Sequence, residues 1–223
     1  MEKYRILNLY ACLGGNRYKW DEVSDNLEIV AVELDPELAK LYKERFPNDT
    51  VIVADAHQYL LDNYQDFDFI WTSPPCPTHS RVRISQKNRE TFVPKYPDMK
   101  LYEEVIFLDN YFKGKYCVEN VLPYYEPLIH AKKRGRNLYW TNFNLPNNVG
   151  KRKVFKNMIE RGDTKELSEF HDYDFTKHKG NQRLNKIARN LVDYEVGRTI
   201  LETAMEIQRQ HNTNQVSLFD ELK

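Results

Sequence analysis

The feature that most constrains the fold is a regular alternation of short apolar runs with helical patterns in the first half of the chain. Strands are expected at residues 4–10, 28–34, 50–54, 67–72 and 116–119, and helices at 36–46, 57–63 and 99–112. Asp35 and Pro36 are typical of the N-cap and first position of a helix. Strands that alternate with helices predict an α/β fold, with a mostly parallel sheet and helices on both faces.

Chemically useful residues follow the predicted strands. In open α/β sheets, ligands bind beyond the carboxyl ends of the parallel strands. We therefore expect one site at this edge, and its candidate residues are Gly14-Gly15, Glu33, Asp55, Cys76 and Glu119.

The first three of these positions are typical of a nucleoside site. Gly14-Gly15 lets the backbone approach a ligand closely. Glu33, 18 residues after Gly15, lies where an acidic residue commonly binds ribose hydroxyls. Asp55 is placed to accept from an adenine amino group. The ordinary alternatives are a tight turn, a solvent-facing carboxylate and a helix N-cap. The ordered set favours an adenosine-type ligand, and without a P-loop lysine motif we expect no polyphosphate.

Cys76 and Glu119 suggest chemistry at the same edge. Cys76 lies in a Pro-Pro-Cys-Pro turn, where the prolines fix the backbone and expose the thiol as a nucleophile requires. A structural cysteine in a rigid turn is the alternative. A zinc site built on Cys76 and His79 lacks a second ligand pair, so we expect no metal.

Together these motifs resemble the DNA cytosine-5 methyltransferase family over nearly the whole chain. Asn8–Gly15 resembles its cofactor loop, and Glu33-Leu34-Asp35-Pro36 and Asp55 resemble the next two cofactor elements. Pro75-Cys76-Pro77 resembles the Pro-Cys-Gln nucleophile loop, Glu119-Asn120-Val121 the Glu-Asn-Val element, and Arg136 the arginine strand element. Arg189-Asn190-Leu191-Val192 resembles the last, asparagine-containing element.

The resemblance implies a Rossmann-like, S-adenosylmethionine-dependent methyltransferase fold and activity. The methyl group would pass to C5 of a flipped-out cytosine through a covalent Cys76 intermediate. Glu119 would hold the N3 edge of the base, and Arg136 would position it. The residues implied in cofactor binding are Tyr10, Leu13, Gly14, Gly15, Glu33, Leu34, Asp55, Ala56, Pro75 and Asn190.

The formal net charge of +0 conceals an uneven distribution. Residues 1–70 contain 7 basic and 14 acidic residues, whereas residues 71–223 contain 26 basic and 19 acidic ones. Cations interleaved with aromatic residues suit a phosphate backbone, here double-stranded DNA, although a solvated basic face is the simpler alternative. The expected DNA contacts are Arg81, Arg83, Arg134, Lys151, Arg152 and Lys153.

Four regions are expected along the chain. Residues 1–143 form the catalytic and cofactor-binding core, and 144–184 form a short, irregular recognition segment. Residues 185–210 contain one long C-terminal helix, over 185–208, that packs back on the core. Residues 211–223 form a flexible tail, in which Gln215, Leu218 and Phe219 resemble the bacterial sliding-clamp-binding pentapeptide. A tail that folds onto its own domain is the alternative to clamp binding.

Other functions remain open at this point. Ser73-Pro74-Pro75 resembles a motif of methyltransferases that modify N4 of cytosine or N6 of adenine. Asn8, Cys12 and Pro77 depart from the cytosine-5 pattern, as a catalytically inactive DNA-binding relative would. An RNA substrate is a third possibility.

The cellular setting follows from what the sequence lacks. The apolar runs are too short for a membrane span, and we expect no targeting segment. An odd count of 3 cysteines fits a reducing cytoplasm. The clamp motif suggests a bacterial or phage-infected cell, with a monomer acting in DNA modification or restriction-modification.

Overall fold

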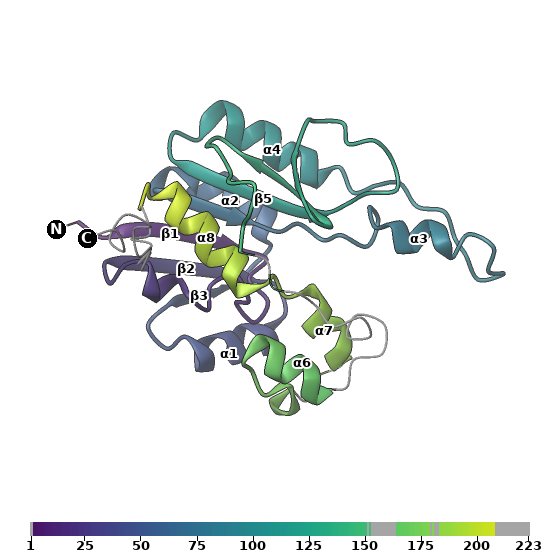
Figure 1. Ribbon diagram of the computed structural model, residues 1–223, viewed down its shortest axis with the longest axis horizontal. Helices are drawn as coiled ribbons and strands as arrows, with labels where there is room; N and C mark the ends of the chain where they lie inside the picture. Colours follow the sequence, from purple (N-terminus) through teal and green to yellow (C-terminus); the bar gives the residue numbers. More distant parts are fainter. Residues whose placement is uncertain (1, 151, 153–163, 179, 181–182, 208–223) are drawn as a thin grey trace, which may run out of the picture.

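The centre of the protein is a seven-stranded sheet, seen in a computed structural model that describes residues 2–150, 152, 164–178, 180 and 183–207 (Figure 1). Its strand order is β3-β2-β1-β4-β5-β7-β6. The first five strands are parallel: β1 (Tyr4–Leu9), β2 (Leu27–Glu33), β3 (Thr50–Val53), β4 (Phe69–Thr72) and β5 (Lys115–Val121). Two antiparallel strands, β6 (Lys132–Arg134) and β7 (Asn137–Thr141), complete the sheet. The predicted α/β fold is confirmed.

Helices cover both faces of the sheet. They are α1 (Pro36–Arg45), α2 (Ala56–Asn63), α3 (Arg81–Ser85), α4 (Lys100–Tyr111), α6 (Thr164–His171), α7 (Leu184–Asn190) and α8 (Tyr194–Ala204). Short 3-10 turns lie at Trp20–Glu22, Tyr64–Asp66 and Phe175–Lys177. Asp35 caps α1 as predicted, because its carboxylate accepts from the backbone N–H groups of Glu37 and Leu38.

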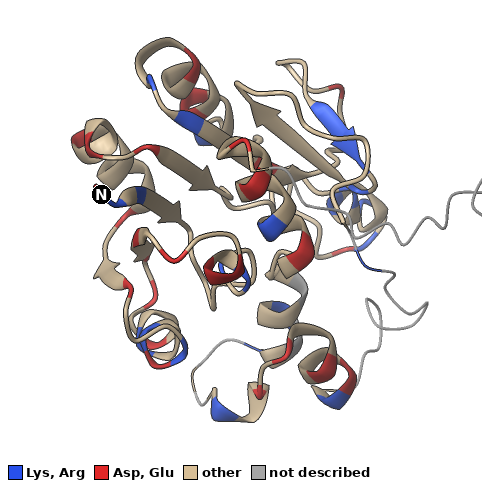
Figure 2. Cartoon of the chain, turned by 60° about the vertical axis from the view of Figure 1, so that its left-hand side comes forward, with Lys and Arg blue, Asp and Glu red and all other residues tan. Residues whose placement is uncertain are grey.

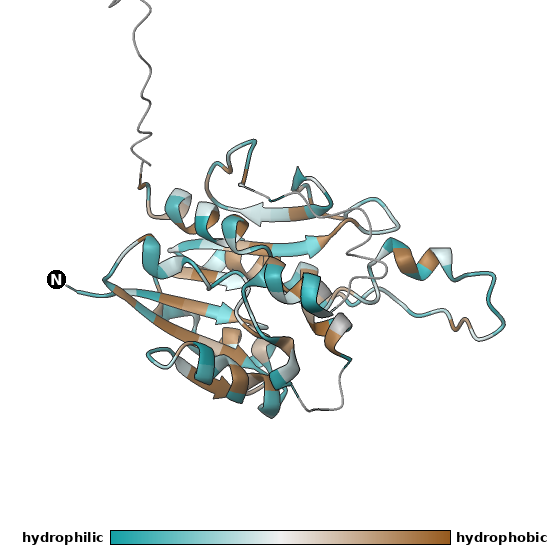
Figure 3. Ribbon diagram, turned by 60° about the horizontal axis from the view of Figure 1, so that its bottom comes forward, coloured by the Kyte–Doolittle hydropathy of each residue, from teal (hydrophilic) through white to brown (hydrophobic). Residues whose placement is uncertain are grey.

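The strands bury side chains on both faces. On one face Leu7 and Leu9 pack with residues of α2 and α4, such as Leu60 and Leu108. On the other face Ile6 packs with Trp20, Trp71 and the α8 residues Val196 and Ile200. Apolar residues accordingly concentrate along the central strands (Figure 3). Burial on both faces explains why the strands appear in the sequence as continuous apolar runs.

The prediction of one helix over residues 185–208 is wrong. The chain forms α7, an extended link at Leu191-Val192, and then α8. Asp193 ends the link as the N-cap of α8, and its carboxylate accepts from the backbone N–H groups of Glu195 and Arg152. An aspartate competes well for free backbone donors at a helix start, so the capping residue divides the apolar stripe into two helices.

The segment 144–184 is also more regular than expected. It contains α6, whose Leu167 packs with Phe175, with Ile187 of α7 and with Leu13, Leu38 and Leu41 from the amino-terminal half. Figure 1 shows α6 and α7 beside α1. Among the described residues, no helix has the length and apolar character to cross a membrane.

Candidate functional site

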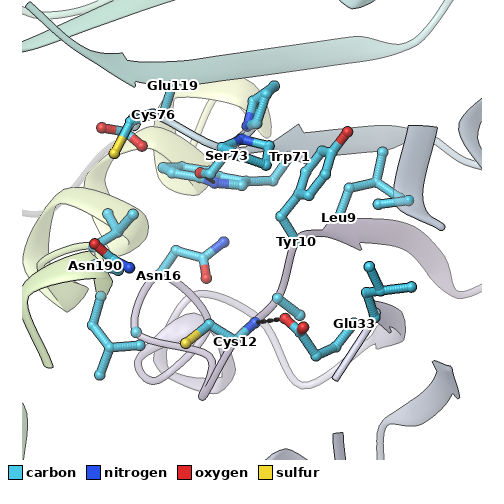
Figure 4. A pocket seen from close by; sticks show the side chains of 18 of the residues that line it. Leu9, Tyr10, Cys12, Asn16, Glu33, Trp71, Ser73, Cys76, Glu119 and Asn190 are labelled. Atoms are coloured by element: carbon cyan, nitrogen blue, oxygen red, sulfur yellow. Dashed lines mark hydrogen bonds between the residues drawn. The ribbon is translucent and has the colours of Figure 1, made fainter. Parts of the chain in front are cut away.

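A cavity of about 540 Å³ lies at the carboxyl ends of the parallel strands. It is lined from the loops that follow β1 to β5 and from α7, as the topology predicts. The predicted site residues that line it are Tyr10, Gly15, Glu33, Leu34, Asp55, Ala56, Pro75, Cys76, Glu119 and Asn190. Figure 4 shows Cys76 and Glu119 at one end of this cavity, with Cys12 and Glu33 at the opposite end.

The loop after β1 is held in a sparsely populated backbone conformation. Tyr10, Cys12 and Gly14 have φ values of 55°, 49° and 65°, which only glycine adopts without cost. This twist turns the N–H of Cys12 toward Glu33, whose Oε2 accepts from it at 2.8 Å. The backbone N–H of Asp35 donates to Oε1 at 2.9 Å. Two backbone donors therefore orient the Glu33 carboxylate, whose pKa is raised by burial.

Leu13 and Gly14 lie behind this loop, not among the residues that line the cavity. Leu13 is fully buried in the cluster with α1 and α6, and Gly14 packs against the rings of Tyr42 and Phe46. Gly15 does line the cavity, and a Cβ there would approach the carbonyl oxygen of Val192 to 2.5 Å. Because Gly15 has no side chain, the link between α7 and α8 can pack against this loop.

The region after β2 and β3 offers polar and apolar groups side by side. Asp55 caps α2 through the N–H groups of His57 and Gln58, so the N-cap alternative is correct for its Oδ1. These bonds are the first cause of its lowered pKa. Leu34 is 67% exposed beside the cavity. An exposed apolar side chain next to carboxylate acceptors suits a planar, amino-bearing ring.

A buried carboxylate missed by sequence analysis ties this region together. Glu104 of α4 is 1% exposed. Its Oε1 accepts from the Tyr10 hydroxyl at 2.5 Å and lies 3.0 Å from His57 Nδ1, and its Oε2 accepts from Thr72 Oγ1 at 2.6 Å. The contacts join the ends of β1 and β4 to the start of α2. In the sequence, the only sign of Glu104 is an acidic residue on the apolar side of an amphipathic helix.

The loop that contains Cys76 is held by hydrogen bonds. The Cys76 backbone carbonyl accepts from the N–H groups of His79 and Ser80, both at 3.0 Å. The Asn120 amide donates to the Pro74 carbonyl at 2.9 Å, which attaches the loop to β5. Burial first, and then the charge of Glu119, raises the pKa of the Cys76 thiol. The thiol therefore needs a bound substrate or a change of surroundings to ionise readily.

The zinc alternative gains no support from this loop. His79 Nδ1 lies 2.5 Å from the Tyr125 hydroxyl. Across the described residues, no group of three or more histidine, cysteine or acidic side chains is arranged to hold a metal ion.

Glu119 is 7% exposed and faces the cavity beside Cys76. The side-chain amide of Asn137 donates to its Oε1. Asn137 pairs with Val121 across β5 and β7, two positions from Glu119 on the same face of the sheet. Sequence analysis missed Asn137, although it directly follows the predicted Arg136.

A second cavity, of about 490 Å³, meets the first at Cys76. Arg81, Arg136 and Phe170 line it, together with Asn137 and Asn190, which border both cavities. Arg136 is exposed in the turn between β6 and β7. Cys76 thus borders both the cavity that Glu119 lines and the cavity that Arg136 lines.

The predicted DNA contacts have different surroundings. Arg134, at the end of the basic strand β6 (blue in Figure 2), donates to the carbonyls of Pro146 and Leu145. Arg152 is paired with Asp193 at 2.9 Å and stacks on Tyr194. Both guanidinium groups therefore serve internal contacts. Lys151 and Lys153 lie outside the described residues.

Arg81 and Arg83 belong to α3, on a projecting arm of residues 81–97 (Figure 1). Arg81 donates to the Pro123 carbonyl at 3.2 Å, and Arg83 donates to the Val93 carbonyl. Arg81 is exposed and lines the second cavity. Arg83 follows it two residues later in α3.

Residues 4–100 match the model of the C-5 cytosine-specific DNA methylases. This part of the chain is similar to that family. The match contains the β1 loop, Glu33, Asp55 and Cys76, and it confirms the resemblance. The match is consistent with methyl transfer to DNA and with S-adenosylmethionine as the cofactor.

A solved methyltransferase structure agrees with the fold of this chain. The methyltransferase EhMeth of Entamoeba histolytica is similar with a TM-score of 0.54 and 10% identity, over 92% of this chain and 99% of that one. A DNMT2 mutant of Spodoptera frugiperda is 23% identical with a TM-score of 0.38, over 53% of this chain and 36% of that one. No curated protein sequence matches significantly. The predicted Rossmann-like methyltransferase fold is confirmed.

Proposed function

We propose that the protein transfers a methyl group from S-adenosylmethionine to C5 of a cytosine in DNA, with Cys76 as covalent nucleophile. The observation that supports this best is the placement of Cys76 next to Glu119 in a cavity whose opposite end presents Glu33. A thiol and a carboxyl group thus face one substrate, while a nucleoside-type site lies within the same cavity.

The residues at the other end of the cavity fit the cofactor. Glu33, oriented by two backbone donors, offers its remaining lone pairs to ribose hydroxyls. Leu34 and Ala56 would cover the adenine ring, and Asp55 would accept from its amino group. Tyr10, Gly15, Pro75 and Asn190 complete this set, with Leu13 and Gly14 supporting the loop from behind. When bound, S-adenosylmethionine supplies an electrophilic methyl group.

Cys76 and Glu119 make the cytosine reactive. The Cys76 thiolate forms a bond to C6, and the electron pair of the C5=C6 bond moves through C4 to N3. N3 takes the proton of Glu119, which leaves an enamine with a nucleophilic C5. Arg136 holds the base carbonyl. As C5 takes the methyl group, N3 returns its proton to Glu119. A base then removes the C5 proton and the C6–S bond breaks, which restores the C5=C6 double bond and the Cys76 thiolate.

The target cytosine must leave the DNA stack to reach Cys76, at a cost of a few kcal/mol. The second cavity opens beside Cys76 toward Arg81 and Arg136, and we assign it to the flipped nucleotide. Arg81 and Arg83 on the arm would hold flanking phosphates, and Lys151 and Lys153 stay predicted contacts. Arg134 and Arg152 would support this surface through their internal contacts.

Cys76→Ala tests the covalent mechanism. We expect methyl transfer to DNA to be abolished, whereas S-adenosylmethionine binding measured by calorimetry is retained. Cys117→Ala, which removes a buried thiol from β5, is the matched control and keeps its activity. Full activity of Cys76→Ala would overturn the mechanism.

The product identifies the class of methyltransferase. Methylated DNA is digested to nucleosides and analysed by mass spectrometry, with an RNA substrate in parallel. We expect 5-methylcytosine from DNA. N4-methylcytosine or N6-methyladenine would favour the amino-methyltransferase alternative, and no product at all would favour the inactive relative. Bisulfite sequencing of DNA from an expressing host then locates the target cytosine.

We also propose that Gln215, Leu218 and Phe219, which lie outside the described residues, bind a bacterial sliding clamp. Short motifs with apolar anchors suit a groove on a partner. Deletion of residues 213–223 should abolish affinity for a purified clamp, measured by calorimetry, and leave methyl transfer to free DNA intact. Unchanged clamp affinity would contradict this proposal. Clamp binding would place a monomeric enzyme in the cytoplasm of a bacterium or phage-infected cell, where it serves DNA modification or restriction-modification.

A further inference from the structure

The carboxyl group of Glu119 has a fixed donor. The side-chain amide of Asn137 donates to Oε1 of Glu119, and both residues line the cavity that contains Cys76. Glu119 is 7% exposed, so little water competes with this contact. Hydrogen bonds to a carboxylate are stronger than those between neutral groups, and more so when shielded from solvent.

The strand pairing holds the two side chains in place. Asn137 begins β7 and pairs with Val121, and Glu119 pairs with Tyr139. Asn137 and Glu119 are therefore diagonal neighbours on one face of an antiparallel ladder, where side chains of this length reach one another. Both backbones are fixed by the sheet, so the amide meets the carboxylate without ordering a loop.

This contact determines where a proton on Glu119 can lie. An amide N–H that points at Oε1 excludes a proton from that oxygen, so the protonated carboxyl group holds its proton on Oε2. The same N–H stabilises the carboxylate that forms when the proton leaves. The amide thus favours one orientation of the acid and also favours its ionisation.

We infer that Asn137 is a positioning residue for the transfer of the Glu119 proton to N3 of the cytosine, and this inference rests on the proposed function. As Cys76 bonds to C6, the Oε2–H bond breaks and an N3–H bond forms. The carboxylate left behind keeps its hydrogen bond from Asn137. Asn137 touches neither reacting atom and acts through Glu119.

Several other ionisable groups lie near Glu119. They are Cys76 from the nucleophile loop, Cys117 on β5 and Tyr139 on β7, with Lys186 of α7 lining the same cavity. The pKa values of Cys76, Cys117 and Tyr139 are all raised by burial, with Glu119 as a further cause. Their ionisation therefore lies on the alkaline side, apart from that of a carboxyl group.

The test compares Asn137→Leu and Asn137→Asp in the full-length protein, on a DNA duplex that contains the mapped target cytosine. Leucine removes the donor at similar size, so kcat should fall on the order of tenfold to a hundredfold, with KM for S-adenosylmethionine unchanged. Aspartate has the same shape but places a second carboxylate against Glu119. Two carboxyl groups at this distance share a proton, so the carboxyl limb of the pH–rate profile should move to higher pH by about one unit or more.

Asn110→Leu, at an exposed position of α4, is the matched control for loss of an asparagine, and its profile should equal that of the wild type. Wild-type kcat and pH profile in both Asn137 variants would overturn the inference. So would an equal loss of activity in both variants with an unmoved pH profile, since that pattern belongs to a merely structural residue. Wild-type protein that makes no 5-methylcytosine overturns the proposed function itself, which separates the two failures.

Discussion

At the scale of single residues, the site depends on carboxylates that are each held by at least one donor from another part of the chain. Glu33 is oriented by backbone donors at Cys12 and Asp35, and Glu119 by the amide of Asn137. In each case the partner fixes a rotatable carboxyl group that would otherwise point freely into the cavity. The loop backbone accepts strain at Tyr10 and Cys12 to make the first of these contacts.

Gly14→Ala should destabilise the protein by ~2 kcal/mol or more. Its φ is +65°, and an added Cβ would approach the ring of Phe46 to 2.4 Å. Gly135, also at positive φ (61°) but exposed, provides the control, because Gly135→Ala has the backbone penalty of about 1 kcal/mol without the buried collision. Urea denaturation measures both, and equal losses would show that packing under the loop is unimportant.

His57 should make stability depend on pH. Its hydrogen bond with Glu104 raises the pKa of His57 above 6.5. A raised folded-state pKa gives a stabilisation that is fully present below the unfolded pKa of 6.5 and is lost as pH rises through the folded-state value. The difference in unfolding free energy between wild type and His57→Gln should therefore shrink over that interval, in urea titrations at several pH values.

The exposed His130 supplies the matched control for the pH experiment as His130→Gln. A difference between wild type and His57→Gln that stays constant with pH would show that the contact with Glu104 does not depend on the charge of His57.

At the scale of elements, the carboxyl-terminal helices are organised by one aspartate. Asp193 caps α8 through Glu195 N and receives both the backbone N–H and Nε of Arg152. The guanidinium of Arg152 in turn stacks on Phe170 of α6 and Tyr194 of α8. This junction joins α6, α8 and the link that borders both cavities.

Asp193→Ala should cost about 3 kcal/mol of unfolding free energy, since it removes a cap and leaves Arg152 without its partner in a largely buried place. Asp193→Asn keeps the capping oxygen and should cost less. Asp174→Ala, which removes an exposed capping aspartate from the Phe175–Lys177 turn, should have a small effect. Urea denaturation of the three variants decides this, and a loss in Asp193→Ala no larger than in Asp174→Ala would contradict the role of the junction.

At the scale of the whole molecule, charge and shape divide the sheet into two ends. The arm of residues 81–97 extends from the carboxyl-end side next to Cys76 (Figure 1) and contains the exposed cations Lys87 and Arg89. Lys3, directly before β1, and Lys113, two residues before the start of β5, are exposed at the opposite edge. A neutral total charge is therefore compatible with exposed cations on a projecting arm beside the candidate site.

For DNA binding, the plot of log K against log salt concentration has a negative slope. The double variant Lys87→Ala/Arg89→Ala should make this slope shallower by about 2, because each lost phosphate contact removes roughly 0.9. The double variant Lys3→Ala/Lys113→Ala should leave that slope unchanged. Fluorescence anisotropy with a labelled duplex measures both. Equal slopes for the two double variants would show that the arm does not contact phosphates.

The sequence by itself determined the five parallel strands, the helices α1, α2 and α4 between them, and the edge of the sheet on which the candidate residues meet. Strands buried on both faces require continuous apolar runs, and helix caps require particular side chains at fixed positions, so both are written locally. The positions of Glu33, Asp55, Cys76 and Glu119 follow from that order, since each lies near or just beyond the carboxyl end of a parallel strand.

The tertiary structure alone decided which side chains hold these residues. Glu104 and Asn137 lie 94 and 18 residues from their partners Tyr10 and Glu119, and nothing local in the sequence marks either pair. The capping of α8 by Asp193 also depends on Arg152, 41 residues earlier. Contacts of this kind depend on strand register and on the packing of helices against the sheet, which exist only once the chain has folded.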